Sequence, residues 1–440
     1  MVDESRTLRC NLPGSIGQLL AVNAVPDLAL LLDGPSCGFH KGELIAGNHD
    51  LTSTLLDAAG DHRICTTDAD VFNIARDRRE LIAGRIDALR RHPDAGLVLV
   101  SALPMASVVG VQYDALIDGL APAAGAAPVH RVEIEPFAAD WLEGYAAVLE
   151  VLAREVDLPV ATPSAGRAVV VGALMDRNEE DRRADLHELT DLLSGVGLDD
   201  CVFLPGSGGF AGDLRRVAGA GVVISLPYGR AAARTLAGRL GATLVETDLP
   251  IGLEGTTRWL RAVGEAIGHA EEAWAVSELL LPRAVRRLEW VVPHHLLHRR
   301  LAFVGDPFLA AGLTAMGREL GFEVAEAFIL GKERQRESLI DPAALPAATH
   351  WQPPASLVTR RLRELHADRP LDLVVTNTHY LHLTRAADLP FLELGFPDAL
   401  SHHLTPAPTL GYRGCLHLAE RLMNRLALFD ALARPVPFRD

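Results

Sequence analysis

The chain has 440 residues, 49% of them hydrophobic, and carries 57 acidic against 42 basic side chains, for a formal net charge of −15. This length predicts about two to four domains, at roughly 100–200 residues each. The acidic balance argues against a nucleic-acid surface, which needs basic patches to contact phosphates, and is compatible with a protein partner that brings a positive patch.

The N-terminus MVDESRTLRC has no apolar core of the kind found in a secretory signal. Nowhere does the chain reach the roughly 18 consecutive apolar residues that a membrane span needs. We therefore expect a soluble, cytoplasmic protein that makes no contact with a membrane. Cytosolic thiols stay reduced, so a disulfide framework is not expected. The cysteines form no CxxC pair and are odd in number: Cys10, Cys37, Cys65, Cys201 and Cys415.

The first 160 residues show an irregular alternation of strand and helix patterns. An apolar run over 25–34 predicts a strand, the spacing over 76–92 predicts a helix, and 95–104 predicts a second strand. The run 30–38, LLLDGPSCG, leads from the first of these strands into a tight turn that carries Cys37.

From residue 167 onward the alternation is regular. Strands are predicted over 167–174, 201–206, 222–228 and 243–250, and helices over 184–197, 213–221, 229–241 and 256–268. The pattern then restarts with strands over 300–306, 322–330 and 371–380 and a helix over 307–321. Strands that alternate with helices of this length are typical of βαβ units around a parallel sheet. The fold class predicted is therefore α/β, with three Rossmann-like domains at 1–162, 163–297 and 298–440, each a mostly parallel sheet flanked by helices.

Ligands of open parallel sheets collect where the strands end. This rule selects the loops that carry Cys37, Ser101–Met105, Pro227–Tyr228 and Gly305–Asp306. The sequence contains no GxGxxG or GxxxxGK[ST] signature, no HExxH and no GxSxG, so ATP binding by a P-loop is not expected. A thiol in such a turn can be a small buried filler, half of a redox pair or a metal ligand.

The C-terminal stretch 391–430 resembles the nitrogenase molybdenum–iron protein β chain and its homologues. The shared residues keep the family's spacing without a gap: Gly395-Phe396-Pro397, His402-His403, Thr409-Leu410-Gly411-Tyr412, Gly414, Asn424 and Asp430. Weaker similarities to that family continue through most of the chain. We interpret His402 and His403 as interface or structural groups, because adjacent histidines do not share a helical face as i, i+4 ligands would.

The resemblance implies an oxidoreductase subunit that pairs with a homologous α-type subunit, as an α2β2 assembly, and shares an iron–sulfur cluster with it. A separate ATP-hydrolysing iron protein would dock there and deliver electrons, so ATP would bind only to that partner. Cys10 and Cys37 match the first two cluster cysteines of the family, and thiolate sulfur suits iron–sulfur clusters.

The third family cysteine is replaced here by Pro104. Cys65 could supply a substitute thiolate for an eight-iron cluster resembling the P-cluster. The alternative is a smaller 4Fe–4S cluster, with mixed ligands shared with the partner subunit. With the smaller cluster, Asp33, His40 or Asp70 could supply an oxygen or nitrogen ligand. The predicted cluster and metal ligands are thus Cys10, Cys37 and Cys65.

The cysteine and histidine that anchor the catalytic cofactor in α-type subunits have no counterpart here, so no catalytic residue is predicted. The hypothesis is a β-type electron-relay subunit whose partner reduces a small molecule, such as a methylthio compound, rather than dinitrogen. The alternatives are a tetrapyrrole reductase subunit, a scaffold on which the nitrogenase cofactor is assembled and, more distantly, a metal-free nucleotide-sugar transferase.

Overall fold

The computed structural model describes residues 11–57, 59–155, 157–206 and 215–433. These residues form three sheets whose strands all pair in parallel and are flanked by helices. The predicted α/β class, with Rossmann-like parallel sheets, is confirmed. None of the described helices combines the length and the apolar character needed to cross a membrane.

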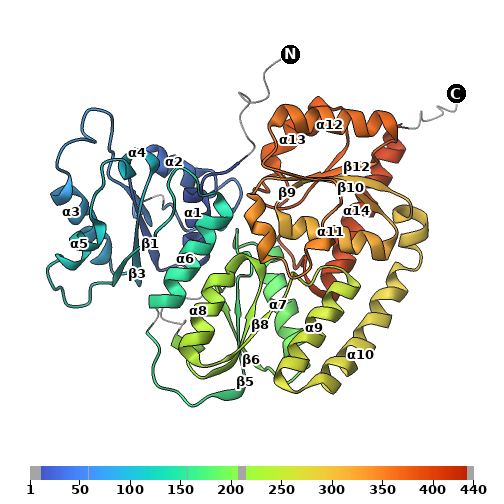
Figure 1. Ribbon diagram of the computed structural model, residues 1–440, viewed down its shortest axis with the longest axis horizontal. Coiled ribbons are helices and arrows are strands. Elements are labelled where there is room, and N and C mark those ends of the chain that lie inside the picture. Colours follow the sequence, from blue (N-terminus) through green and yellow to red (C-terminus); the bar gives the residue numbers. More distant parts are fainter. Residues whose placement is uncertain (1–10, 58, 156, 207–214, 434–440) are drawn as a thin grey trace. The chain divides into compact units, whose positions relative to one another are not determined.

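The first sheet has the strand order β2-β1-β3-β4. Its strands are β1 (Leu28–Asp33), β2 (Ile64–Thr66), β3 (Leu97–Ala102) and β4 (Val129–Arg131). Its helices are α1 (Gly14–Ala24), α2 (Cys37–Glu43), α3 (Arg79–Arg90), α4 (Pro104–Ser107), α5 (Tyr113–Asp118) and α6 (Trp141–Glu155). Helices α3 and α5 cover one face, and α1 and α6 lie on the other (Figure 1).

Helix α1 is buried along its whole length, since it packs directly against α6. Glycines permit this close approach: a Cβ atom on Gly17 would lie 1.7 Å from the carbonyl oxygen of Trp141, and one on Gly144 would lie 1.9 Å from that of Gly14. Gln18 on α1 donates to Ser101 Oγ at 2.9 Å. The helix is thereby tied to the end of β3.

The second sheet has the order β6-β5-β7-β8. Its strands are β5 (Ser164–Val171), β6 (Asp200–Leu204), β7 (Ala220–Ser225) and β8 (Thr243–Glu246), and its helices are α7 (Glu180–Ser194), η3 (Pro227–Gly229) and α8 (Arg230–Leu240). Four predicted strands are confirmed here. Of the helix predicted over 213–221, the described part holds only a short 3-10 turn over 215–217, because Gly219, with φ +79°, ends it and Ala220 already begins β7.

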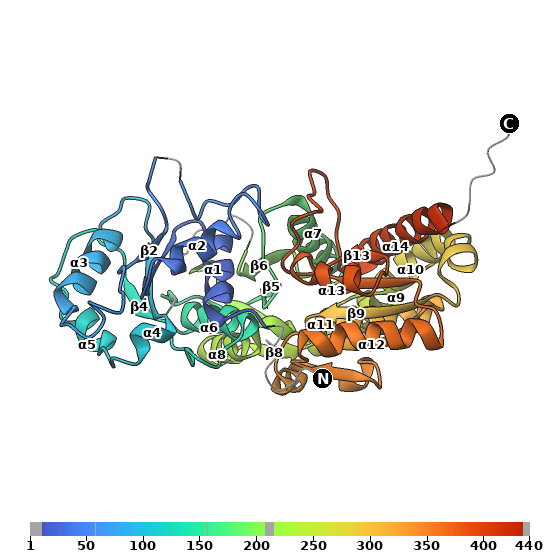
Figure 2. The same ribbon diagram turned by 90° about the horizontal axis from the view of Figure 1, so that it is seen from above.

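The third sheet has the order β11-β10-β9-β12-β13. Its strands are β9 (Arg300–Gly305), β10 (Glu323–Ile329), β11 (Thr349–Trp351), β12 (Leu373–Thr376) and β13 (Phe391–Glu393). The helices of this part are α9 (Leu253–Ile267), α10 (Ala270–Leu288), η4 (Val292–Leu296), α11 (Pro307–Leu320), η5 (Glu333–Ser338), η6 (Pro342–Ala344), α12 (Ala355–Asp368), η7 (Thr378–Tyr380), α13 (Leu381–Ala386) and α14 (Gly411–Ala433). Figure 2 shows α12 on one side of the sheet and α14 on the other.

The start of α11 illustrates how the sequence encodes these elements. Asp306 is the N-cap and accepts hydrogen bonds from the backbone N–H groups of Phe308 and Leu309, at 2.9 and 3.0 Å. Pro307 follows at the first helical position, where its missing N–H costs nothing, and Gly321 ends the helix in the left-handed conformation.

The chain divides into two compact units. One contains 12–186 and 198–246, with the first and second sheets, and the other contains the third sheet with 187–197 and 247–433. Each of the ranges 1–162, 163–297 and 298–440 holds one sheet. The boundaries between these ranges stay a prediction.

Candidate functional site

Cys37 is the first residue of α2 and lies just beyond the end of β1, with its side chain exposed. The turn before it is closed by backbone hydrogen bonds from Gly38 to Pro35 and from Phe39 to Ser36, at 3.0 and 2.9 Å. The predicted position of Cys37, in a loop at the carboxyl end of a parallel strand, is therefore the one observed.

Two glycines allow the Cys37 turn to pack against the loop that follows β3. Gly34 has φ +153°, and a Cβ atom there would lie 2.7 Å from Leu103 Cβ. A Cβ atom on Gly38 would meet side-chain atoms of Leu103 and Thr66 at 3.1 and 3.2 Å. A residue with a side chain at position 34 would push the two loops apart.

These two loops mark the point where the strand order of the first sheet reverses, since β1 lies between β2 and β3. The backbone N–H of Leu103 donates to the carbonyl of Asp33 at 2.8 Å, and Pro104 follows as the first residue of α4. Ligands of open parallel sheets bind at such switch points. Cys37 and Pro104, the second and third positions of the family's ligand pattern, are thus carried by adjacent loops.

Asp33 is buried, and its carboxylate is fully engaged. Arg78 donates to both carboxylate oxygens, at 2.5 and 3.1 Å, while Thr67 and Tyr113 donate at 2.6 and 2.5 Å. Burial raises the pKa of Tyr113 far above its ordinary value, and the hydrogen bond to Asp33 adds to this effect. This network fixes the end of β1 and leaves Asp33 without a free oxygen for a metal.

The other two candidate oxygen and nitrogen ligands lie in exposed segments and already have local partners. Asp70 accepts from the backbone N–H groups of Phe72 and Asn73, both at 2.8 Å. His40 pairs with Glu43 at 2.8 Å on the exposed side of α2. Asp70 thus orders the loop after β2, and His40 contributes to the surface of α2.

A positive charge lies one helical turn after Cys37. The Lys41 ammonium donates to Ser15 Oγ at 2.8 Å, which holds it against α1. Burial lowers the pKa of Lys41, and the charge of the Cys37 thiolate acts in the opposite direction. The two groups therefore interact electrostatically, and this ammonium would offset part of the negative charge of a thiolate-bound cluster.

Cys65 lies on the opposite face of the first sheet from α2. It is in strand β2 and packs in an apolar cluster with Leu31 and Ile82. The neighbouring residue Thr66 faces Gly38 on the α2 side. Successive side chains of a strand point to opposite faces, so the structure does not bring Cys65 and Cys37 together. Burial raises the pKa of the Cys65 thiol.

The ligand predictions therefore divide into three cases. Cys37 is exposed at the switch point, Cys65 is half-buried on the other face, and Cys10 lies outside the described residues. Within the described part of the chain, no group of three or more His, Cys, Asp or Glu side chains is arranged to hold a metal ion. All three cysteines stay predictions as ligands, and the geometry favours Cys37.

The remaining cysteines are packing residues. Burial raises the pKa of both Cys201 and Cys415 to about 12. The Cys201 thiol donates to the carbonyl of Leu198 at 3.2 Å, and Cys415 is completely buried within α14.

Residues of the C-terminal motif hold α14 in place within the compact unit that contains the third sheet. Gly411 has φ +77° and begins α14, and the Tyr412 hydroxyl is 2.7 Å from Thr257 Oγ1. Further along the helix, Asp430 pairs with Arg299 at 2.5 Å. His403 lies edge-on to the ring of His417, with centroids 5.8 Å apart. The motif that carries the resemblance thus has a structural role at these positions.

A buried polar network between the loops 47–53 and 173–179 was not predicted from sequence. Asp50 accepts from the Asn23 side chain at 2.7 Å and from the backbone N–H of Asn178 at 3.0 Å. Asp176 pairs with Arg182 at 2.5 Å and lies 3.6 Å from His49. The only signal in the sequence is the charged run MDRNEEDRR, which is separated from the end of β5 by three residues and is easily taken for a solvated helix start.

Burial alone would raise the pKa of Asp176, but Arg182 and His49 outweigh this and hold the pKa well below its ordinary value. The carboxylate is therefore ionised throughout the neutral range. The network joins the loops at the ends of the first and second sheets, which lie in one compact unit.

Comparison with known proteins gives a family match over residues 14–427, to the model described as nitrogenase component 1 type oxidoreductase. The chain is 32% identical over 201 residues to the nitrogenase molybdenum-iron protein beta chain of Frankia alni, covering 44% of this chain and 36% of that protein. It is 28% identical over 249 residues to a subunit of the light-independent protochlorophyllide reductase of Heliobacterium modesticaldum, covering 56% of this chain and 47% of that protein. The matched segments thus span less than half the length of these relatives.

A solved structure titled "Nitrogenase Cp1 at pH 6.5" superimposes with a TM-score of 0.79 over 100% of this chain and 98% of the other, at 15% sequence identity. A second, titled "Nitrogenase Cp1 at pH 5", gives a TM-score of 0.74 at 12% identity, over 99% and 93%. These likenesses show the fold.

Proposed function

Since this chain belongs to the nitrogenase component 1 type oxidoreductase family, we propose that it is the β-type subunit of a two-component reductase. It holds part of an iron–sulfur cluster at the interface with an α-type partner. Electrons come from an ATP-hydrolysing iron protein and pass to a catalytic cofactor in that partner. The observation that carries this proposal is the exposed Cys37 thiol at the switch point of the first sheet.

The surroundings of Cys37 suit an iron–sulfur cluster. Soft thiolate sulfur binds iron strongly, and Gly34 and Gly38 let the Cys37 turn pack closely against the loop after β3, which leaves the Cys37 side chain exposed. When bound, such a cluster accepts and donates single electrons, with a potential set by its charge, hydrogen bonds and exposure. The chain's own part is to hold the Cys37 turn rigidly through Asp33, Arg78 and Leu103 and to place Lys41 nearby.

Cys37 is proposed as one ligand, with Cys10 as a second from this chain. Cys65 remains a candidate third ligand only if the loop or strand around it rearranges, because it faces α3. Pro104 supplies no ligand at the third family position. An eight-iron cluster resembling the P-cluster would need a third thiolate from this chain. A 4Fe–4S cluster that takes its other ligands from the α-type partner needs fewer thiolates and therefore suits these residues better.

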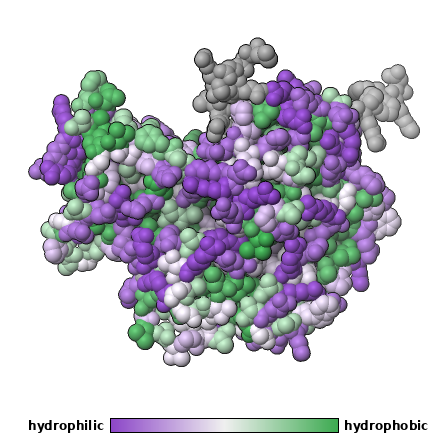
Figure 3. All heavy atoms as spheres, viewed as in Figure 1, coloured by the Kyte–Doolittle hydropathy of each residue, from purple (hydrophilic) through white to green (hydrophobic). Residues whose placement is uncertain are grey.

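Exposed apolar side chains surround the two loops and support a protein partner there. Val71 and Phe72 are 73% and 82% exposed, and their loop is joined to the Cys37 turn by a hydrogen bond from Ala69 N–H to the Gly34 carbonyl, at 3.0 Å. Val108, after α4, is 73% exposed. In Figure 3, apolar residues gather at the tip of the part of the chain that carries the first sheet, whereas most of the face shown is hydrophilic. Such gathered apolar groups mark interaction surfaces.

The substrate proposed is a small molecule, such as a methylthio compound, and not dinitrogen, since Pro104 removes one thiolate from the pattern of the nitrogenase β chain. A tetrapyrrole is the second candidate substrate. It is supported by the match to a protochlorophyllide reductase subunit over 56% of this chain, which is longer than the 44% matched by the nitrogenase β chain of Frankia alni.

The test is anaerobic co-purification of the chain with its α-type partner, followed by iron analysis and electron paramagnetic resonance. The proposal predicts stoichiometric iron, a cluster signal on reduction and reductase activity that depends on the iron protein and ATP. A complex that contains iron but shows no such activity would indicate an assembly scaffold. A colourless, iron-free complex would rule out the cluster.

A further inference from the structure

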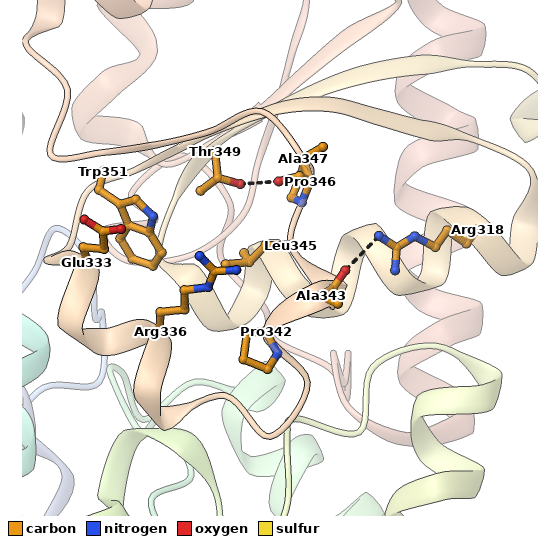
Figure 4. A pocket seen from close by; sticks show the side chains of 10 residues that line it. All are labelled: Arg318, Glu333, Arg336, Pro342, Ala343, Leu345, Pro346, Ala347, Thr349 and Trp351. Atoms are coloured by element: carbon orange, nitrogen blue, oxygen red, sulfur yellow. Dashed lines mark hydrogen bonds between the residues drawn. The ribbon is translucent and has the colours of Figure 1, made fainter.

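A pocket of about 360 Å³ lies at the edge of the third sheet that is formed by β11 (Figure 4). Its walls come from the end of α11, from η5 and η6, and from the edge strand β11. Ligand pockets in proteins have volumes of about 300–1,000 Å³. This one is therefore large enough for a small organic molecule.

The walls of the pocket are held by hydrogen bonds from side chains to the backbone. Asp248 accepts from the N–H groups of Ile340 and Asp341, at 2.8 and 2.9 Å, and fixes the start of η6. Thr349 donates to the Pro346 carbonyl at 2.6 Å, and Arg318 donates to the Ala343 carbonyl at 3.1 Å. A pocket whose walls are already fixed loses little entropy when a ligand binds.

The charges that line the pocket are unusual for this acidic chain. The lining carries two positive side chains, Arg318 and Arg336, and one negative side chain, Glu333. The pocket is thus net positive, whereas the whole chain has a net charge of −15. In Figure 4 the guanidinium group of Arg336 reaches over Leu345 and Pro342. In the part of the chain described, neither the Arg336 nor the Glu333 side chain has a hydrogen bond or ion pair. One N–H group of Arg318 donates to the Ala343 carbonyl, and within the described residues its other N–H groups are left to bind a ligand.

The rest of the lining is apolar. The Trp351 ring, at the end of β11, forms one wall, and Pro342, Leu345 and Pro346 form others. Guanidinium groups recognise carboxylates and phosphates through paired hydrogen bonds, and an indole offers a flat surface for a planar group. The pocket thus combines an anion-recognising side with an apolar one.

We infer that this pocket binds a small organic anion, with its carboxylate or phosphate against Arg336 and Arg318 and its planar apolar body against Trp351. A carboxylate and a phosphate share this chemistry, and the choice of probes separates them. The site is independent of the iron–sulfur cluster and of the substrate-reducing reaction proposed above.

The test measures binding of four probes to the full-length chain by titration calorimetry and by tryptophan fluorescence. Benzoate and phenyl phosphate represent the two anions, benzamide is the neutral analogue, and inorganic phosphate lacks the apolar body. We expect at least one aromatic anion to bind and the neutral analogue to bind at least about tenfold more weakly, as loss of a charge-assisted hydrogen bond implies. If inorganic phosphate alone binds as tightly as phenyl phosphate, the role given to Trp351 is wrong.

Substitutions then assign the site. Arg336→Gln is expected to weaken binding of the anion about tenfold or more. Trp351→Phe is expected to abolish the fluorescence change while binding persists by calorimetry. The matched control is Arg287→Gln, because Arg287 is an exposed arginine on α10, outside the pocket lining. Iron content should be the same in all three variants.

Two results would overturn the inference. One is the absence of binding by both aromatic anions at concentrations up to about 10 mM, which corresponds to less than about 3 kcal/mol of binding free energy. The other is an equal loss of affinity in Arg287→Gln and Arg336→Gln, which would show that only the general charge of the surface matters.

Discussion

The backbone N–H of Leu103 donates a hydrogen bond to the carbonyl of Asp33, and this bond of 2.8 Å fastens the loop after β3 to the loop after β1. The turn that carries Cys37 and the segment that carries Pro104 are therefore neighbours at the switch point of the first sheet. A change at either loop is expected to reach the other through Leu103.

Gly34→Ala is expected to displace the Cys37 turn, because the new Cβ atom would lie 2.7 Å from Leu103 Cβ. We expect a loss of about 1–3 kcal/mol in the free energy of unfolding, measured by urea denaturation, together with reduced iron in the purified complex. The control is Gly84→Ala in α3, where nothing lies within 4 Å of the added Cβ atom. That substitution should leave stability unchanged or raise it by up to about 1 kcal/mol. Equal stability of the two variants would contradict the packing described.

Asp33→Asn tests the network that fixes the end of β1. The substitution leaves the buried guanidinium of Arg78 without its charged partner, and breaking a buried ion pair in this way costs about 3–5 kcal/mol. Urea denaturation should show this loss. Asp77→Asn is the control, because Asp77 pairs with Arg79 on the exposed surface, where such pairs contribute little. If the two substitutions have the same effect, Asp33 does not hold the loop.

The depressed pKa of Asp176 predicts a pH dependence of stability. The pKa of Asp176 is lower in the folded chain than in the unfolded chain, where it is about 3.9. The ionised carboxylate therefore stabilises the fold at a pH above about 3.9, and this stabilisation is lost as the pH falls below about 3.9. The wild-type chain should therefore unfold at higher urea than Asp176→Asn near pH 6, and the difference should shrink towards pH 3. A difference that stays constant over this range would show that the ionised state of Asp176 does not contribute.

Phe72→Asp tests the apolar surface beside the Cys37 turn. A charge at this 82% exposed position should weaken association with the α-type partner at least about tenfold, as measured by co-purification and analytical ultracentrifugation, without unfolding the chain. Val160→Asp is the control, since Val160 is fully exposed in the segment between the first and second sheets. Association that is unaffected by Phe72→Asp would place the partner elsewhere.

Much of the fold follows from sequence because local signals and long-range packing agree. The strands predicted over 167–174 and 300–306 contain the uninterrupted apolar runs 168–174 and 301–305, and Asp306-Pro307 caps the helix that follows the second of these. By contrast, α1 (Gly14–Ala24) is buried on all sides and has no polar face, so it lacks the periodicity that reveals a surface helix.

The candidate site was only partly predictable. The exposed turn of Cys37 was expected from the strand before it and the glycines around it. The face on which Cys65 lies was not, because β2 is only three residues long, too short for an alternating pattern to show. The partners of Asp33 were equally hidden, since Thr67, Arg78 and Tyr113 are brought together by three separate loops and helices.

The most direct test of the central claim compares iron content and electron paramagnetic resonance in Cys37→Ala and Cys201→Ala, each purified anaerobically with the α-type partner. Cys201 is a half-buried thiol of β6 and controls for the loss of a cysteine. We predict that Cys37→Ala loses the cluster signal and the reductase activity while keeping its partner, whereas Cys201→Ala retains all three. Full iron content and an unchanged signal in Cys37→Ala would contradict the assignment of Cys37 as a cluster ligand.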